Sequence, residues 1–318
     1  MVGDSILKGK KIVLCVTGSV AAIEAPKLAR ELRRSGADVF CVMSKSAKGI
    51  IHPDVLEWAS EREVVTKITG KVEHVKLAGD IPEKADLVVI APCTANTLGK
   101  IAAGIDDTPV TTLVTTAFGS KIPLLVVPAM HGSMYKHPIV LENIAKLKKL
   151  GVVVMEPKLE EGKAKFPGIN HVVTEIKGCL SKKDLLGKKI LVTAGPTAED
   201  IDDIRYISNK SSGKMGVWLA EEAVARGAKV VLVRGNTMVE PNCVLKDINV
   251  KSAQELFAAI KENINADVII HAAAVSDYTV EKQGGKISSE KGLALELTPT
   301  TKVLEKIKEL NSSIFLIG

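Results

Sequence analysis

The sequence predicts an α/β protein built from two three-layer α/β/α domains. Short runs of Val, Ile, Leu and Ala alternate with amphipathic helical patterns, which is the arrangement that gives parallel sheets covered by helices. The chain has 318 residues, a length that favours two domains. Hydrophobic residues make up 46% of the chain but aromatic residues only 3%, so aliphatic side chains must fill the cores. Such cores are typical of parallel sheets.

In the first half, apolar runs predict the strands of one parallel sheet, and the segments between them predict its helices. The predicted strands are residues 11–16, 37–43, 86–91, 124–128 and 152–155. The predicted helices are residues 20–34, 53–60, 95–104, 139–150 and 172–186. Pro26 lies inside the first helix and indicates a bend there. The run 109–116 fits either a helix or a strand.

The second half repeats this alternation and predicts a second sheet. Its predicted strands are residues 189–193, 229–233, 244–250, 267–273 and 313–317. Its predicted helices are residues 213–226, 252–263 and 301–310. A charged stretch containing Gly187 separates the two patterns, so we place the domain boundary there and predict domains 1–187 and 188–318.

Composition and charge exclude several classes of protein. The formal charge of +6 comes from basic residues spread among acidic ones, the pattern of a solvated surface rather than a nucleic-acid-binding face. No apolar run approaches the ~18 residues of a membrane span, and the N-terminus lacks the apolar core of a signal peptide. The five cysteines lack CxxC spacing, which predicts free thiols in a reducing compartment. We therefore expect a cytoplasmic protein that binds neither nucleic acid nor membranes.

Ligands of parallel α/β sheets bind beyond the carboxyl ends of the strands, so the loops that follow the strands are informative. Gly18 and Ser19 follow the first strand and suit a phosphate at a helix N-terminus. Ser44 follows the second, where hydroxyls and a lysine favour a terminal phosphate over a ribose and indicate a mononucleotide such as a flavin phosphate. After the third strand, Thr94 and Asn96 either cap the next helix or contact a flavin ring.

The first strand of the second half is followed by a polar loop, residues 193–216, of about 20 residues, whereas such connections usually have ~2–6. A long polar loop at this edge of a sheet usually carries chemistry. Arg234 stands where a reductase would bind the 2′-phosphate of NADP, but the G-x-G-x-x-G fingerprint is absent, so a reductase is the second interpretation. Residues 211–214 lack the upstream glycine of a Walker motif, which excludes that assignment.

Several long motifs carry a resemblance to known families. Residues 16–22, 91–104 and 128–135 resemble the homo-oligomeric FMN-containing cysteine decarboxylases, among them phosphopantothenoylcysteine decarboxylase. Residues 195–216 and 271–278, with the segment from Gly285 to Ile287, resemble phosphopantothenate–cysteine ligase. Nearly the whole chain is thus similar to the bifunctional coenzyme A biosynthesis proteins, archaeal rather than bacterial in its flap.

For the first half, the resemblance implies a Rossmann-like flavoprotein domain whose FMN sites lie between the protomers of a homo-oligomer. His74, just before a short strand-like segment, matches the histidine that serves decarboxylation. His131 and Met134 match substrate-binding positions, although relatives have asparagine in place of His131. The flap, residues 156–168, lacks the cysteine of relatives, and Lys163 or Lys165 falls near its position. The FMN-binding residues implied are Gly18, Ser19, Ser44, Pro92, Thr94 and Asn96.

For the second half, the resemblance implies a Rossmann-like ligase domain that uses CTP with Mg²⁺, and we assign no metal ligands. CTP activates the carboxylate of phosphopantothenate as an acyl-cytidylate, and the cysteine amine attacks it. The catalytic residues implied are Asn209, Arg205 and Lys286. Those implied to bind CTP are Ser211, Ser212, Gly213, His271, Ala272, Ala273, Asp277, Lys286, Leu316, Ile317 and Gly318. Helix caps at Asn209 and Ser212 and an Asx turn at Asp277 are the alternatives.

The two activities form a sequence in which the ligase product, phosphopantothenoylcysteine, is decarboxylated to 4′-phosphopantetheine. A non-catalytic flavoprotein subunit is the rival interpretation, because the flap cysteine is absent and His131 replaces an asparagine. A flavin prenyltransferase would leave the second domain unexplained. Relatives continue beyond the position of Gly318, so we expect a C-terminally truncated ligase domain.

Overall fold

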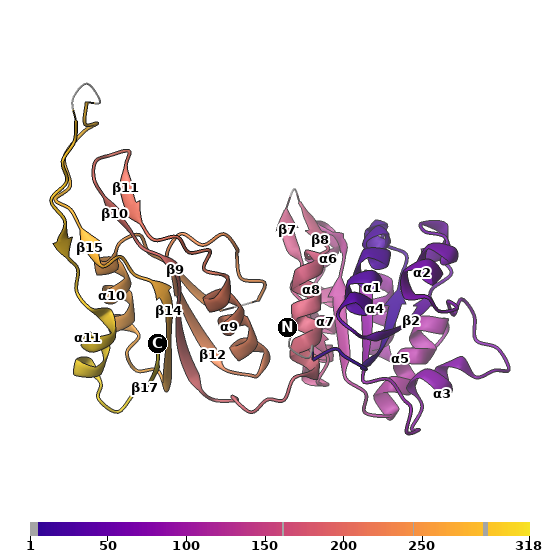
Figure 1. Ribbon diagram of the computed structural model, residues 1–318. Coiled ribbons are helices and arrows are strands. Elements are labelled where there is room, and N and C mark those ends of the chain that lie inside the picture. Colours follow the sequence, from indigo (N-terminus) through magenta and orange to yellow (C-terminus); the bar gives the residue numbers. More distant parts are fainter. Residues whose placement is uncertain (1–5, 161, 244, 289–291) are drawn as a thin grey trace. The chain divides into compact units, whose positions relative to one another are not determined.

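The computed structural model describes residues 6–160, 162–243, 245–288 and 292–318 (Figure 1). The chain divides into two compact units, of which the first ends at Ser181 and the second begins at Lys182. Gly187, the predicted boundary, lies in a turn shortly after this division. Within the described residues, no helix has the length and apolar character needed to cross a membrane.

The first unit is organised around a parallel five-stranded sheet in the order β2-β1-β3-β4-β6. Its strands are nearly continuous apolar runs because helices cover both faces. The strands are β1 (Lys11–Val16), β2 (Asp38–Met43), β3 (Leu87–Cys93), β4 (Leu124–Pro128) and β6 (Val153–Val154).

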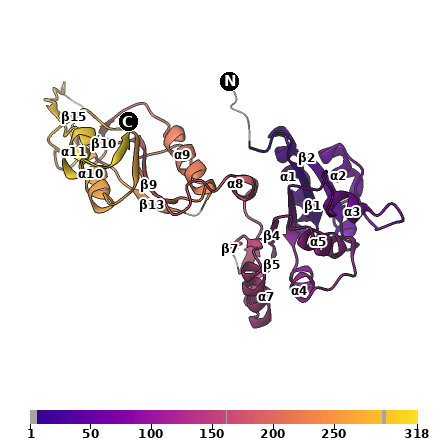
Figure 2. The same cartoon turned by 90° about the horizontal axis from the view of Figure 1, so that it is seen from below.

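Helices cover both faces of this sheet and complete three layers (Figures 1 and 2). One face packs against α1 (Ala25–Arg34), α2 (Pro53–Ser60) and α8 (Ile169–Leu180). The other packs against α4 (Ala95–Ala103), α5 (Pro109–Gly119) and α7 (Pro138–Lys149). The ambiguous run is therefore the helix α5, which Thr108 starts with a capping box. Pro26 lies in the first turn of α1, where proline is tolerated, after the short 3₁₀ helix η1 (Val20–Glu24).

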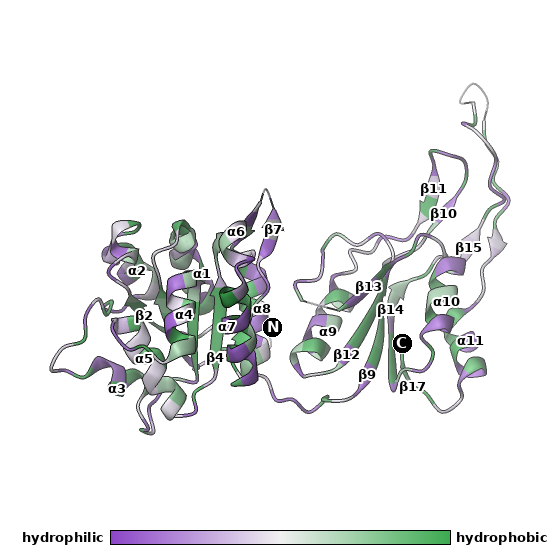
Figure 3. Cartoon of the chain, turned by 180° about the vertical axis from the view of Figure 1, so that it is seen from behind, coloured by the Kyte–Doolittle hydropathy of each residue, from purple (hydrophilic) through white to green (hydrophobic). Residues whose placement is uncertain are grey.

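The second unit has the same architecture, with a parallel sheet in the order β13-β12-β9-β14-β17. Helix α9 (Lys214–Ala225) covers one face, and α10 (Ala253–Glu262) and α11 (Val303–Leu310) cover the other. Figure 3 shows the hydrophobic strands of both sheets between helices of mixed character. The strands are β9 (Lys189–Pro196), β12 (Lys229–Arg234), β13 (Lys246–Asn249), β14 (Val268–Ala274) and β17 (Phe315–Ile317). Residue 244, the predicted start of the third strand, lies outside the described residues.

Small antiparallel elements stand where the sequence suggested loops. The long polar connection after β9 contains the hairpin β10 (Ala198–Asp200) and β11 (Tyr206–Ser208). The flap is a hairpin of β7 (Lys158–Glu160) and β8 (Lys163–Lys165), which pairs with β5 (Met130–His131) before the short α6 (Gly132–Tyr135). The strands β15 (Tyr278–Thr279) and β16 (Thr298–Pro299) pair with each other.

The expectation of a strand-like segment after His74 is wrong, because His74 lies in helix α3 (Glu73–Ala78). Val75 and Leu77 alternate with polar residues as in a strand, but only Leu77 and Ala78 are buried. The Glu73 carboxylate accepts hydrogen bonds from the amide and hydroxyl of Thr69 at the helix start, which lower the pKa of Glu73 to about 2. The hydrogen bonds of Glu73 to Thr69 and the short apolar contact of Leu77 and Ala78 therefore accompany a helix rather than a strand.

Candidate active sites

Three loops of the first unit meet at the carboxyl edge of its sheet. The buried Thr17 hydroxyl donates to the carbonyl of Pro92 at 2.8 Å and accepts from the amide of Thr94 at 3.1 Å, which joins the ends of β1 and β3. A Cβ added to Gly18 would lie 2.4 Å from the Cβ of Ser46, so the loops after β1 and β2 are in close contact. Only glycine permits this approach. The predicted flavin residues are thus assembled at one edge.

The hydroxyls at this edge bond to nearby backbone N–H groups, and those of Ser19 and Thr94 cap helices. Ser19, Ser44 and Thr94 each accept a hydrogen bond from a backbone N–H two or three residues later. The capping interpretation therefore holds for Thr94. Asn96 is exposed in the first turn of α4 and is not its cap, so its side chain is accessible to a ligand. Small residues, helix starts and an exposed amide fit the phosphate and ring of a flavin mononucleotide.

His74 lies at the opposite edge of the same sheet. The Lys11 ammonium, at the start of β1, donates to the carbonyl of Lys76 at 3.3 Å, and the carbonyl of Leu77 accepts from Ala85 just before β3. A strand the length of β1 separates the two edges by roughly 15–20 Å. Within one chain, His74 and the flavin residues are therefore not brought together. The His74 Nδ1 is buried and has no hydrogen-bond partner among the described residues.

His131 caps the helix α6 and faces the flap. Its Nδ1 accepts from the amide of Ser133 at 3.3 Å, as the asparagine expected from relatives could do. In the antiparallel pairing of β5 with β8, His131 stands opposite Lys163, one of the two lysines singled out in the flap. Met134 is 49% exposed on the same helix. The structure thus brings the predicted substrate residues and the flap together.

In the second unit, a hydroxyl network joins the carboxyl ends of β9 and β14. The buried Thr193 hydroxyl accepts from the amide of Ala273 at 3.1 Å and lies 2.9 Å from the Nδ1 of His271. Burial lowers the pKa of His271, which favours the neutral ring. Ala272 lies between these residues on β14.

Asn209 connects the end of the hairpin to β14. Its Nδ2 donates to the carbonyl of Val275 at 2.9 Å and to that of Ala274 at 3.4 Å. Asn209 is therefore not a helix cap. Because its Nδ2 is engaged, its Oδ1 is the group left for a ligand at this edge.

The start of α9 is packed closely against the loop that follows β12. Gly213 has φ +69°, and a Cβ there would lie 2.4 Å from the Cγ2 of Thr237 and 3.0 Å from the Cα of Gly195. The Ser211 hydroxyl accepts from the amide of Gly213 at 3.3 Å, and that of Ser212 from the amide of Lys214 at 3.5 Å. The N-cap of α9 is Gly213, so the capping interpretation does not hold for Ser212. The same hydroxyls line a helix N-terminus, which suits a phosphate.

Asp277 forms an ion pair rather than the alternative Asx turn. Its Oδ1 accepts from the ammonium of Lys302 at 2.6 Å, and this hydrogen bond raises the pKa of Lys302. Its carbonyl accepts from the amide of Thr300 at 2.9 Å. Both side chains of the pair are exposed, so Asp277 can exchange this partner for a ligand hydroxyl.

The last predicted CTP residues lie along the edge strand. Leu316 and Ile317 pair with Ile269 and Ile270 of β14, which places them one step before His271. Gly318 follows directly. These residues border the site edge but lie behind the hydroxyl network.

Asp202, which was not among the predicted site residues, links Arg205 to the segment that contains Lys286. The Arg205 guanidinium donates to the carbonyl of Ile287 at 3.1 Å and lies 3.3 Å from the carboxylate of Asp202, which is 1% exposed. Ile287 directly follows Lys286. The run of acidic residues before Arg205 was the available signal, but it reads equally well as a solvated turn.

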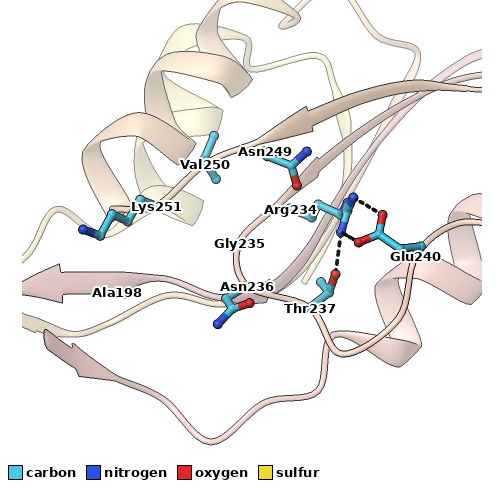
Figure 4. A pocket seen from close by; sticks show the side chains of 9 residues that line it. All are labelled: Ala198, Arg234, Gly235, Asn236, Thr237, Glu240, Asn249, Val250 and Lys251. Carbon is cyan, nitrogen blue, oxygen red and sulfur yellow. Dashed lines mark hydrogen bonds and ion pairs between the residues drawn. The ribbon is translucent and has the colours of Figure 1, made fainter.

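Arg234 is fully engaged by protein groups. Its guanidinium donates to the carboxylates of Asp247 and Glu240 and to the hydroxyl of Thr237. These bonds use all five N–H groups and raise the pKa of Arg234. Figure 4 shows the cavity beside it, of about 290 Å³. No donor of Arg234 is left for the 2′-phosphate of NADP, which disfavours the reductase interpretation.

Among the residues that the structure describes, no group of three or more His, Cys, Asp or Glu side chains is arranged to hold a metal ion. Cys15, Cys41 and Cys93 are buried thiols that form no disulfide. Burial raises the pKa of the Cys41 thiol to about 12.

Comparison with known proteins covers both units. The family model described as Flavoprotein matches residues 4–181, and that described as DNA/pantothenate metabolism flavoprotein C-terminal domain matches residues 185–318. The coenzyme A biosynthesis bifunctional protein CoaBC of Thermococcus kodakarensis is 54% identical over 316 residues, 98% of this chain and 78% of that protein. Proteins of the same name from Methanocaldococcus jannaschii and Bacillus subtilis are 41% and 34% identical, over 99% and 98% of this chain and 77% and 80% of their own lengths. The chain belongs to the family of coenzyme A biosynthesis bifunctional proteins.

Proposed function

We propose that this chain catalyses two consecutive steps of coenzyme A biosynthesis. The second unit joins 4′-phosphopantothenate to cysteine at the expense of CTP, and the first decarboxylates the product to 4′-phosphopantetheine. The observation that carries the proposal is the 54% identity to the Thermococcus protein, which extends over 98% of this chain and both units. The residues assembled at the carboxyl edge of each sheet supply the chemistry.

The ligase step needs positive charge and N–H donors around a triphosphate and a donor or acceptor at the reacting carboxyl group. The phosphopantothenate carboxylate attacks the α-phosphate of CTP and releases pyrophosphate, which gives an acyl-cytidylate. The cysteine amine then attacks the acyl carbon, and CMP leaves. We assign the phosphates to the helix start at Ser211, Ser212 and Gly213 and to Lys286, and the acyl group to Asn209. Mg²⁺ accompanies the triphosphate, as is usual for nucleotides.

For the decarboxylase step, we propose that FMN binds at Gly18, Ser19, Ser44, Pro92, Thr94 and Asn96. When bound, FMN would supply the oxidation of the substrate at its thiol-bearing end and the later reduction of the decarboxylated product. His131 and Met134 hold the substrate under the flap. His74 acts as the acid–base residue of the decarboxylation. The buried Nδ1 of His74 has no hydrogen-bond partner in the described part of the chain. It also lies at the opposite edge of the sheet, and both observations support a site shared between chains of a homo-oligomer.

A combined assay tests both halves. Purified protein is examined for flavin absorbance and then incubated with phosphopantothenate, cysteine, CTP and Mg²⁺ while CMP and carbon dioxide are measured. We expect a flavin spectrum and equal release of CMP and carbon dioxide. A flavin spectrum without release of either product would support the rival, a non-catalytic flavoprotein subunit. We also propose a cytoplasmic location, which the buried thiols of Cys15, Cys41 and Cys93 support.

A further inference from the structure

The turn between β10 and β11 holds a distant segment of the second unit through one buried carboxylate. Asp202 is 1% exposed, and its Oδ1 accepts from the amides of Ile204 at 2.8 Å and Arg205 at 2.6 Å. Its Oδ2 accepts from the amide of Ile287 at 3.2 Å. Burial acts to raise the pKa of Asp202, but these donors outweigh it and keep that pKa below its ordinary value. The carboxylate is therefore charged at neutral pH.

The peptide of Ile287 is bound on both sides. While Asp202 accepts from its N–H, Arg205 donates to its carbonyl at 3.1 Å and also pairs with Asp202. On the other side of Lys286, Gly285 is held separately, because its amide donates to the carboxylate of Asp203 at 3.0 Å. Lys286 thus stands between two anchored residues, more than 80 positions along the chain from the turn that anchors them.

We propose that Asp202 is a positioning residue for the ligase reaction, which holds Arg205 and the backbone of Lys286 in register at the nucleotide site. The inference rests on the proposed function, in which Lys286 binds the triphosphate. The backbone of a loose segment loses conformational entropy when its lysine binds, whereas the backbone of an anchored segment has already lost it. This role requires no contact of the Asp202 carboxylate with phosphopantothenate, cysteine or CTP. The carboxylate acts through Arg205 and Lys286, which it orients.

Asp202→Asn keeps the shape of the side chain but removes its charge and turns an acceptor into a donor that faces backbone N–H groups. We expect kcat/KM for CTP to fall about 10- to 100-fold, the size expected when hydrogen bonds to a charged group are lost. The loss should appear in the KM for CTP, while the KM for cysteine stays within twofold of the wild type. Glu199→Gln is the matched control, because this buried hairpin carboxylate accepts from the amide of Ala253 at 2.8 Å and does not contact the anchored segment.

Hydrogen exchange of amides 282–288 gives a readout that is independent of activity. Exchange should accelerate at least tenfold in Asp202→Asn and remain unchanged in Glu199→Gln. Ile287→Pro, which removes the N–H that Asp202 accepts, should reproduce the kinetic effect if Asp202→Asn fails to fold. Wild-type kinetics in Asp202→Asn, or equal losses in Glu199→Gln, would overturn the inference. A wild-type protein that is inactive as a ligase but shows the exchange difference would overturn the proposed function and leave the anchoring role standing.

Discussion

Gly213 offers a quantitative test of the packing at the start of α9. Gly213→Ala places a residue with a Cβ at φ +69°, which costs about 1–2 kcal/mol for an L-residue. The new methyl group would also lie 2.4 Å from the Cγ2 of Thr237. That side chain cannot turn away freely, because its hydroxyl accepts from Arg234 and donates to the carbonyl of Val239. Overpacking of this kind costs about 1–3 kcal/mol.

The end of the same helix provides the control. Gly227 has φ +94°, but the nearest atoms to an added Cβ lie 3.5 Å away, which is an ordinary contact. Gly227→Ala should therefore cost only the backbone term of about 1–2 kcal/mol, and Gly213→Ala about 2–5 kcal/mol. The loss of chain freedom in the unfolded state is the same for both substitutions and cancels in the difference.

The measurement is urea unfolding followed by tryptophan fluorescence. The chain has two tryptophans, so Trp58→Phe leaves Trp218, on α9, as the reporter of the second unit. The free energies of unfolding should differ by about 1–3 kcal/mol between the two variants. Equal values would refute the close packing of Gly213 against Thr237. Gly213→Ala should also lower the ligase kcat/KM, because Ser211 and Ser212 precede it in the same loop.

Three further predictions concern the two sites. Asn209→Asp should lower the ligase rate at least about 100-fold and leave decarboxylation of added phosphopantothenoylcysteine unchanged, because it places a carboxylate against two backbone carbonyls; normal CMP release would contradict this role. His74→Asn should abolish carbon dioxide release while the flavin spectrum stays, and release at the wild-type rate would exclude His74 from the mechanism. Because burial lowers the pKa of His271, the unfolded chain binds more protons below the ordinary pKa of about 6.5. Stability should therefore fall as the pH drops from 7.5 to 5, and His271→Gln, measured alongside, should reduce that slope.

The elements that could be predicted from the sequence are those with a continuous local signal. The strand Lys11–Val16, the strand Leu124–Pro128 and the helix Pro53–Ser60 have the predicted bounds because turn residues or prolines punctuate clear apolar runs. The helix α8 ends at Leu180 instead of the predicted residue 186, because Ser181 adopts an extended backbone and its hydroxyl donates to the carbonyl of Lys177. A side-chain hydrogen bond of this kind produces no periodic pattern in the sequence.

Features that depend on distant partners escaped prediction. The flap lysine was located near a family position, but its pairing opposite His131 is a register between segments about 30 residues apart. Asp202 lies in a turn rich in acids, where a solvated carboxylate is the ordinary expectation. Its burial depends on Ile287, whose amide lies 85 positions away. Local patterns identify which residues could act, whereas long-range hydrogen bonds decide which are held in place.

A buried threonine bonds to the neighbouring parallel strand in both units. Thr17 directly follows the last residue of β1, and Thr193 lies within β9; each comes directly after a valine. Both are fully buried, and each hydroxyl accepts from a backbone amide at the carboxyl end of the neighbouring parallel strand, Thr94 and Ala273 respectively, at 3.1 Å. The Thr17 hydroxyl satisfies a backbone donor just beyond the paired residues of β1 and β3. The pairing of β9 with β14 continues to Pro196 and Ala274, so Thr193 adds its side-chain hydrogen bond within the ladder. A valine at either position would have nearly the same shape but would remove this hydrogen bond. In both units, therefore, a buried threonine hydroxyl helps to hold the first strand of the sheet against the neighbouring strand.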